Sequence, residues 1–158
     1  MKNLNRFFAS VALGLFTFIG QSFTNPAFQT PIIVPAGLEV SLESGIDFSS
    51  EDVEIGHSVD FFVRNNVVVN NQVVIAAGST ASGEITRVTK ADPRCQNCQT
   101  GCASIQIVVK SVQAVDGTSI KLRSTPINIK ANAPGCAAQL QIGHRFSAFT
   151  LTNARVNL

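Results

Sequence analysis

The sequence predicts an all-β protein, a small single-domain barrel or sandwich of about eight to ten short, mostly antiparallel strands behind a cleaved N-terminal signal helix. Three observations support this fold class. Apolar and polar residues alternate along several segments, turn residues separate these segments, and long apolar stripes with a period of 3.6 residues are missing. One short exception is 49–52, where a serine cap followed by acids can open a single helical turn.

The first half of the chain contains four predicted strands. The alternation covers 38–43 and returns at 59–64. Segments 67–69 and 72–75 flank Asn70-Asn71, and asparagine tolerates the left-handed backbone angles of a two-residue hairpin turn. These two segments therefore predict a β-hairpin.

The second half continues in the same way. Apolar residues alternate over 105–109 and lead to Asp116-Gly117, the strongest hairpin signal of the sequence, after which the alternation returns along 120–122. Segment 127–130 alternates again, and 146–158 is rich in β-branched and apolar residues. We expect each of these segments to form a strand.

Residues 1–24 have the organisation of a secretory signal. Lys2 and Arg6 precede an apolar run at 7–20, and a small polar exit follows with cleavage expected after Ser22 or Thr24. A membrane anchor is the alternative, but the run is shorter than the roughly 20 residues that span a bilayer. We expect a single β domain at 25–158 with no later membrane span, exported to the periplasm, the cell surface or the extracellular space.

The charges are balanced in sum but divided along the sequence. Without Lys2 and Arg6, ten bases face ten acids, which argues against a nucleic-acid partner. Segment 39–60 holds seven acids and no base, whereas the ten bases all lie at Arg64 or beyond with three acids. Either the strands interleave and the charges mix, or a dipole favours head-to-tail contact between copies or an acidic Ca²⁺-binding loop. Tyr and Trp are absent, so stacking platforms for sugars or bases are scarce.

A repeated pattern predicts sharp corners between strands. A four-residue pattern occurs four times: an apolar residue, a variable residue, a small or apolar residue, and glycine. A strand-like segment follows each of the four glycines. Glycine permits the positive φ that such a change of direction requires. With the glycine of the Asp116-Gly117 hairpin, the predicted structural turn glycines are Gly37, Gly56, Gly78, Gly117 and Gly143.

The order of these corners resembles a group of small exported bacterial β-barrel proteins with repeated Ile/Val-Pro-x-Gly corners. The residues that carry the resemblance are Val34-Pro-Ala-Gly37, Val53-x-Ile-Gly56, 73–78, 83–88 and the strand that ends at Asp116-Gly117. More remotely, the group is similar to the barrel domain of type IV secretion outer-membrane scaffolds, whose long helical and proline-rich regions have no counterpart in this sequence. The resemblance implies a barrel and an envelope location, and it brings no catalytic residues.

Four cysteines predict disulfides. Cys95, Cys98 and Cys102 share a loop at 92–103, and Cys136 follows downstream. In an exported chain an even count indicates two disulfides, and each of the three pairings ties Cys136 to this loop. Closing a loop of about 35–40 residues would contribute about 3–4 kcal/mol in the chain-entropy model.

Other chemistry of these cysteines is disfavoured. A c-type haem site would need histidine at the position of Gln99, and a paired zinc motif lacks its second Cys-x-x-Cys. A redox pair lacks the strand-to-helix context that lowers a thiol pKa. We therefore expect no cofactor and no metal.

The remaining polar residues form no recognisable catalytic motif. His57, Ser58 and Asp60 are too close along one strand to make a triad, because successive side chains point to opposite faces, and His144 follows another corner glycine. The spacing of the acids at 47–54 fits no EF-hand loop.

The sequence therefore predicts a non-enzymatic exported structural or binding module of the bacterial envelope or extracellular matrix. Its expected partner is a second copy, in an oligomer or fibre, or another envelope protein, because the last strand and the 67–75 hairpin are apolar enough for edge pairing. An accessory subunit of a secretion or conjugation apparatus is the alternative. A third hypothesis is a small hydrolase that uses Glu51 and Asp52.

Overall fold

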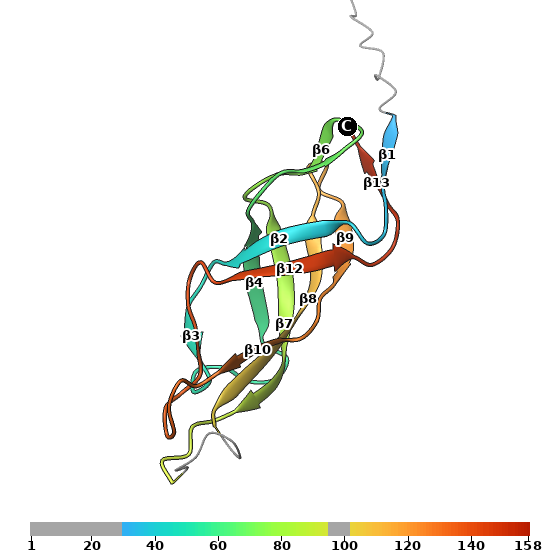
Figure 1. The fold of residues 1–158 in the computed structure, drawn as a ribbon. Helices are drawn as coiled ribbons and strands as arrows, with labels where there is room; N and C mark the ends of the chain where they lie inside the picture. The colour runs from blue at the N-terminus through green and yellow to red at the C-terminus, as the bar shows by residue number, and fades with distance from the viewer. Residues whose placement is uncertain (1–29, 95–101) are drawn as a thin grey trace, which may run out of the picture.

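A computed structural model describes residues 30–94 and 102–158, which form thirteen strands and no helix (Figure 1). Every strand pairing in these ranges is antiparallel. The strands are β1 (Pro31–Val34), β2 (Glu39–Ser44), β3 (Phe48–Ser49), β4 (Ser58–Val63), β5 (Val67–Val69), β6 (Gln72–Ile75), β7 (Thr80–Thr89), β8 (Ser104–Gln113), β9 (Ser119–Arg123), β10 (Ile127–Lys130), β11 (Gln139–Leu140), β12 (Arg145–Thr150) and β13 (Ala154–Asn157).

The all-β prediction is confirmed, although the strands are more numerous than expected. Two of the additional strands, β3 and β11, have two residues each, which is too short for an alternating pattern. Segment 49–52 forms a turn and no helix. No helix that could cross a membrane is found in the described ranges.

Six strands close into a barrel in the order β8-β7-β4-β2-β12-β9, and β9 pairs back onto β8. Their inward positions follow the two-residue period that the sequence shows, as in β2, where Val40 and Leu42 are fully buried between more exposed neighbours. Closure satisfies the backbone of these strands on both edges, which removes the exposed edges of an open sheet.

The centre of the barrel is organised by Phe61. Its ring packs edge-on against Phe146, with centroids 5.1 Å apart and planes at 80°. A Cβ atom on Gly83 of the neighbouring strand would lie 2.7 Å from this ring and 3.0 Å from the carbonyl oxygen of Val108. The absence of a side chain at Gly83 thus makes the space in which the Phe61 ring lies.

One edge of β8 is shared between two partners. Ser111–Gln113 pair with β9, whereas Ser104–Ile107 pair with β10. Between them, the Val109 N–H donates to the Ser124 hydroxyl at 3.1 Å, so a side chain fills the gap in the ladder. Strand β10 thereby leaves the barrel wall at its lower end, and within the described residues its other edge has no strand partner.

Three two-stranded ribbons complete the fold, β1–β13, β5–β6 and β3–β11. The first two lie at the upper end of the molecule in Figure 1, and β3–β11 lies towards the lower end. At the upper corner the buried Thr150 hydroxyl donates to the Pro35 carbonyl and accepts from the Leu38 N–H. This side chain joins the turn before β2 to the end of β12.

The predicted strand at 146–158 is interrupted. Strand β12 ends at Thr150, and β13 begins at Ala154. Between them, the Asn153 carboxamide oxygen accepts a hydrogen bond from the Ala36 N–H at 2.9 Å. The chain therefore turns away from β2 here and pairs with β1 instead.

Turn chemistry explains why the hairpins were predictable from sequence. Asn70 and Asn71 have φ values of 50° and 64° between β5 and β6. The five glycines of the predicted corners also have positive φ, between 76° and 88°. At all five, a Cβ would meet open space, so the backbone angle rather than crowding favours glycine. These residues are Gly37, Gly56, Gly78, Gly117 and Gly143.

Candidate functional site

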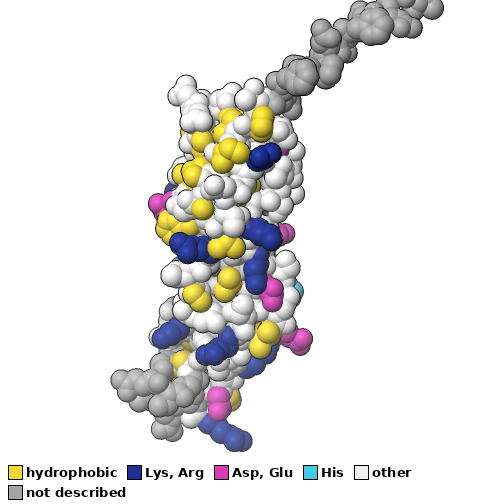
Figure 2. All heavy atoms as spheres, turned by 90° about the vertical axis from the view of Figure 1, so that its right-hand side faces the viewer, with side chains coloured by type: hydrophobic (Ala, Val, Ile, Leu, Met, Phe, Trp, Pro, Cys, Tyr) yellow, Lys and Arg dark blue, Asp and Glu magenta, His cyan; other side chains and the backbone are white. Residues whose placement is uncertain are grey.

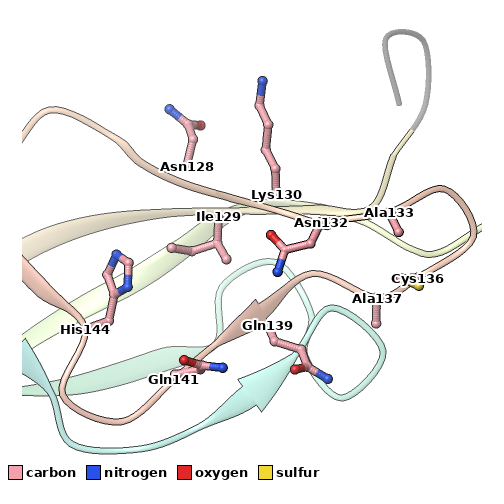
Figure 3. A pocket seen from close by; sticks show the side chains of 10 residues that line it. All are labelled: Asn128, Ile129, Lys130, Asn132, Ala133, Cys136, Ala137, Gln139, Gln141 and His144. Atoms are coloured by element: carbon pink, nitrogen blue, oxygen red, sulfur yellow. The ribbon is translucent and has the colours of Figure 1, made fainter. Parts of the chain in front are cut away.

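A groove of about 670 Å³ lies between β10 and β11 (Figure 3). Its upper wall is β10 with the loop that follows, and its lower wall is β11 with the turn before β12. Its volume falls within the range of small-ligand sites. The groove exists because β10 leaves the barrel wall while β11 pairs with β3 on the other side.

Uncharged amide side chains dominate the lining. Asn132, Gln139 and Gln141 are exposed, and in the part of the chain that the structure describes their side chains make no hydrogen bond. Ile129 points into the groove from β10, whereas Lys130 points away from it in Figure 3. Each amide offers donors and an acceptor without charge, so the lining suits a neutral ligand with hydroxyl or amide groups.

His144 lies at one end of the groove. It follows the corner glycine Gly143, and its imidazole lies against the Phe146 ring with centroids 5.2 Å apart and a tilt of 40°. The His144 imidazole therefore gives the groove one flat ring surface, although Tyr and Trp are absent from the chain.

Cys136 lies at the other end of the groove, and its thiol is free and exposed. The prediction that every disulfide arrangement ties Cys136 to the 95–102 loop is therefore wrong. Cys102 is disulfide-bonded, but not to Cys136. Closing a loop of about 35–40 residues between Cys102 and Cys136 would cost more chain entropy than closing a short loop. Cys95 and Cys98 lie outside the described residues, as does the predicted signal at 1–24.

Neither histidine lies in a catalytic arrangement. Within the described ranges no hydrogen bond joins either imidazole to a serine, a cysteine or a carboxylate. Cys136 and His144 are separated by the length of the groove in Figure 3. Ser58 and Asp60 are exposed on β4, and His57 precedes that strand at a different corner from His144.

The acidic residues of 47–54 are held by local contacts. The Asp52 carboxylate accepts hydrogen bonds from the Ser49 hydroxyl at 2.6 Å and from the Ser49 N–H at 3.2 Å, and these bonds lower the pKa of Asp52. The Glu51 carboxylate accepts from the Ala91 N–H at 2.8 Å. No group of three metal-ligating side chains occurs among the described residues.

The predicted division of charge survives only in part. Strand β12 brings Arg145 opposite Glu43 on β2, and two ion pairs form in the described ranges, Arg64–Glu43 at 3.5 Å and Lys110–Glu84 at 3.7 Å. Mixing of this kind follows from antiparallel pairing between distant segments. Lys121 and Arg123 on β9 have no ion-pair partner in the described ranges.

From the sequence, His144 is expected as a corner histidine and Cys136 as a disulfide cysteine, and the groove that both of them line was not predicted. The signal that was available is the concentration of Asn and Gln between Asn128 and Gln141 in a chain region without strong strand patterning. No protein-family model and no curated protein matches this chain.

Proposed function

We propose that the chain is a non-enzymatic exported module of the bacterial envelope or extracellular matrix that binds a neutral, hydroxyl- and amide-bearing ligand such as an envelope glycan. The observation that carries the proposal is the groove between β10 and β11, where unpartnered amides surround the nearly buried Ile129. Hydrogen bonds from amides to hydroxyl or N-acetyl groups would supply specificity, and the apolar floor would contact the hydrophobic face of a sugar ring.

The arrangement of the lining residues supports binding without chemistry. A nucleophile needs a base within hydrogen-bond reach, and Cys136 and His144 lie at opposite ends of the groove. Export to the envelope is supported by the organisation of residues 1–24 and by the barrel that the family resemblance implies.

The test is a titration of the ¹⁵N-labelled domain with short N-acetylglucosamine oligomers, followed by NMR. Shift changes should be confined to 128–144, and the Asn132→Ala/Gln141→Ala double variant should weaken binding about thirty-fold, because two hydrogen bonds of about 1 kcal/mol each are lost on a solvated surface. Gln113→Ala changes an exposed amide on β8 and serves as the control. Shifts elsewhere, or equal affinity in the double variant, would contradict the proposal.

A second candidate is an accessory subunit of a secretion or conjugation apparatus. The closed six-stranded barrel favours it, because a barrel is what the resemblance to secretion scaffolds implies. Affinity capture from cross-linked cell envelopes should then recover pore components and a secretion ATPase in constant ratio to this chain. Recovery of this chain without them would exclude this role.

A further inference from the structure

Two neighbouring strands place an apolar and positively charged patch on the outside of the barrel. Phe149 on β12 is the register partner of Arg123 on β9, and the Leu151 N–H donates to the Lys121 carbonyl at 2.9 Å. Phe149 is 39% exposed and Leu151 is 47% exposed. We call these four residues the basic patch.

The side chains of the basic patch are available for a partner. Lys121 and Arg123 are exposed, and neither takes part in the two ion pairs of the described ranges. Figure 2 views the molecule from the side of β1, β9 and β13, and on this face Lys and Arg side chains form a band next to apolar ones. An exposed aromatic ring with arginine beside it is typical of the centre of a protein–protein interface.

A complementary surface lies between β2 and β4. Segment 46–55 contains four carboxylates and no base, and its Ile46 and Ile55 are 40% and 67% exposed. The Lys90 ammonium donates to the carbonyls of Glu51 and Val53, which leaves a net charge of −3 (four carboxylates against one ammonium). We call this segment the acidic corner.

The acidic corner is concave. A hollow of about 320 Å³ is lined by Asp47 and Asp52 together with Phe48 and residues of β11. Because hydrogen bonds from Ser49 lower the pKa of Asp52, its carboxylate stays charged in mildly acidic solution. A hollow of this size and charge can take the end of an arginine or lysine side chain.

The two surfaces of one copy cannot meet each other. Phe149 pairs with Glu39 at the start of β2, whereas the acidic corner begins beyond Ser44 at its end. A strand of this length separates them by about 20 Å. Figure 1 accordingly places β9 and β3 on opposite sides of the molecule.

We propose that copies of this chain associate head to tail, with the basic patch of one copy docked on the acidic corner of the next. Lys121 and Arg123 meet the carboxylates of the corner, and Phe149 and Leu151 contact the exposed isoleucines. Because the two surfaces differ, the contact is heterologous and produces a ring or an open filament. The inference rests on the proposed structural role in the envelope, but not on the groove or its ligand.

The test uses two charge-reversed variants of the mature domain. Lys121→Glu/Arg123→Glu makes the basic patch acidic, and Asp47→Lys/Glu54→Lys makes the acidic corner basic. Asp47 and Glu54 are chosen because their carboxylates accept no hydrogen bond in the described ranges, unlike Glu51 and Asp52. The Arg94→Glu/Lys130→Glu variant changes the net charge as the first variant does, but outside both surfaces.

Sedimentation velocity should show that the natural chain associates between about 10 µM and 1 mM and dissociates in about 0.5 M salt. Each reversed variant alone should weaken association at least about ten-fold, and the control should associate like the natural chain. An equimolar mixture of the two reversed variants should associate again, since each then meets the opposite charge on the other. Circular dichroism establishes that all variants are folded.

Three results would overturn the proposal: a natural chain that stays monomeric at 1 mM, reversed variants that associate normally, or a mixture that does not recover association. Vesicles with about one third anionic lipid provide a further arm. If the natural chain is monomeric and binds these vesicles through Lys121 and Arg123, the basic patch is a membrane surface and self-association is excluded. Glycan binding in the groove should be unaffected by the Lys121→Glu/Arg123→Glu reversal. The glycan titration and the sedimentation experiment therefore test the proposed function and the proposed self-association separately.

Discussion

The closed barrel and the two-stranded ribbons of this molecule differ in what borders their strands. Each barrel strand has a hydrogen-bonded neighbour on both sides, whereas each ribbon has two strands and therefore two edges without a strand partner in the described ranges. The barrel holds Phe61 and most of the other large side chains that are fully buried, whereas the ribbons at the upper end add fewer, among them Val34, Val74 and Ile75. Stability is therefore concentrated in the barrel, whereas the groove lies outside it, between β10 and β11.

The largest expected effect comes from the centre of the barrel. Phe61→Ala should lower the free energy of unfolding by about 3–5 kcal/mol, because it removes a fully buried ring and leaves a cavity. Phe62→Ala, one position along the same strand, removes a ring that is 39% exposed and should cost about 1 kcal/mol. Urea unfolding of both variants gives the difference, and equal values would show that the centre of the barrel does not dominate stability.

Two glycines sharpen the comparison between interior and surface. Gly83→Ala should cost about 1–3 kcal/mol, because the new methyl group lies against the Phe61 ring and a backbone carbonyl inside the barrel. At Gly45 the three atoms nearest to the methyl group all belong to the ring of Phe62, which is half-exposed and can rotate outwards. Thermal unfolding should therefore show a clearly smaller loss for Gly45→Ala than for Gly83→Ala. The reverse order would contradict this account of the barrel centre.

Single hydrogen bonds should follow the same rule with smaller effects. Ser124→Ala leaves the Val109 N–H without its acceptor in a partly buried part of the barrel wall and should cost about 1–2 kcal/mol. Asn153→Ala removes an acceptor from the exposed Ala36 N–H at the ribbon corner, where water replaces it, and should cost about 0.5 kcal/mol. Urea unfolding measures both, and a larger loss for Asn153→Ala would mean that the ribbon corner is more important than its exposure indicates.

The smallest effect is a dependence of the β1–β13 ribbon on pH. The Asn157 N–H donates to the Asp116 carboxylate at 2.9 Å, and this bond, together with those from Thr118, lowers the pKa of Asp116. A lowered pKa in the folded state stabilises the ribbon above the unfolded value of about 3.9, and the stabilisation is lost as the pH falls through the folded value.

Hydrogen exchange measures this dependence directly. Between about pH 6 and pH 3, amides of β13 should lose protection before those of β4 and β7, after correction for the intrinsic rate. Asp116→Asn should make the ribbon equally labile at both pH values and leave the barrel amides unchanged. Simultaneous loss of protection in ribbon and barrel would show that they form one cooperative unit.

The sequence was informative where local chemistry decides the structure. Asn70-Asn71 and Asp116-Gly117 predicted two hairpins because turn residues set the backbone angles without help from distant residues. The alternation in β2, β4 and β9 predicted which side chains are buried. These are statements about neighbours along the chain, for which the sequence is sufficient.

The groove and the basic patch depend on distant pairing and could not be predicted, whereas the acidic corner is one segment of the sequence. Gln139 meets Ser49 only because β11 pairs with β3, and two-residue strands leave no periodic pattern. The free thiol of Cys136 was missed because an even cysteine count was taken to imply complete pairing. Arg145 beside Glu43 shows why a division of charge along the sequence does not become the same division in space.

The pairing of β2 with β12 has a consequence for biogenesis. A ribosome delivers the chain from its N-terminus, so β2 emerges about one hundred residues before Phe146 to Phe149, with which it pairs. The barrel cannot close before those residues arrive, and contacts between distant segments make closure slow. During delivery the apolar strands are therefore open to chaperones and to other nascent chains. Closure of the barrel is therefore a late event, which follows the synthesis of β12.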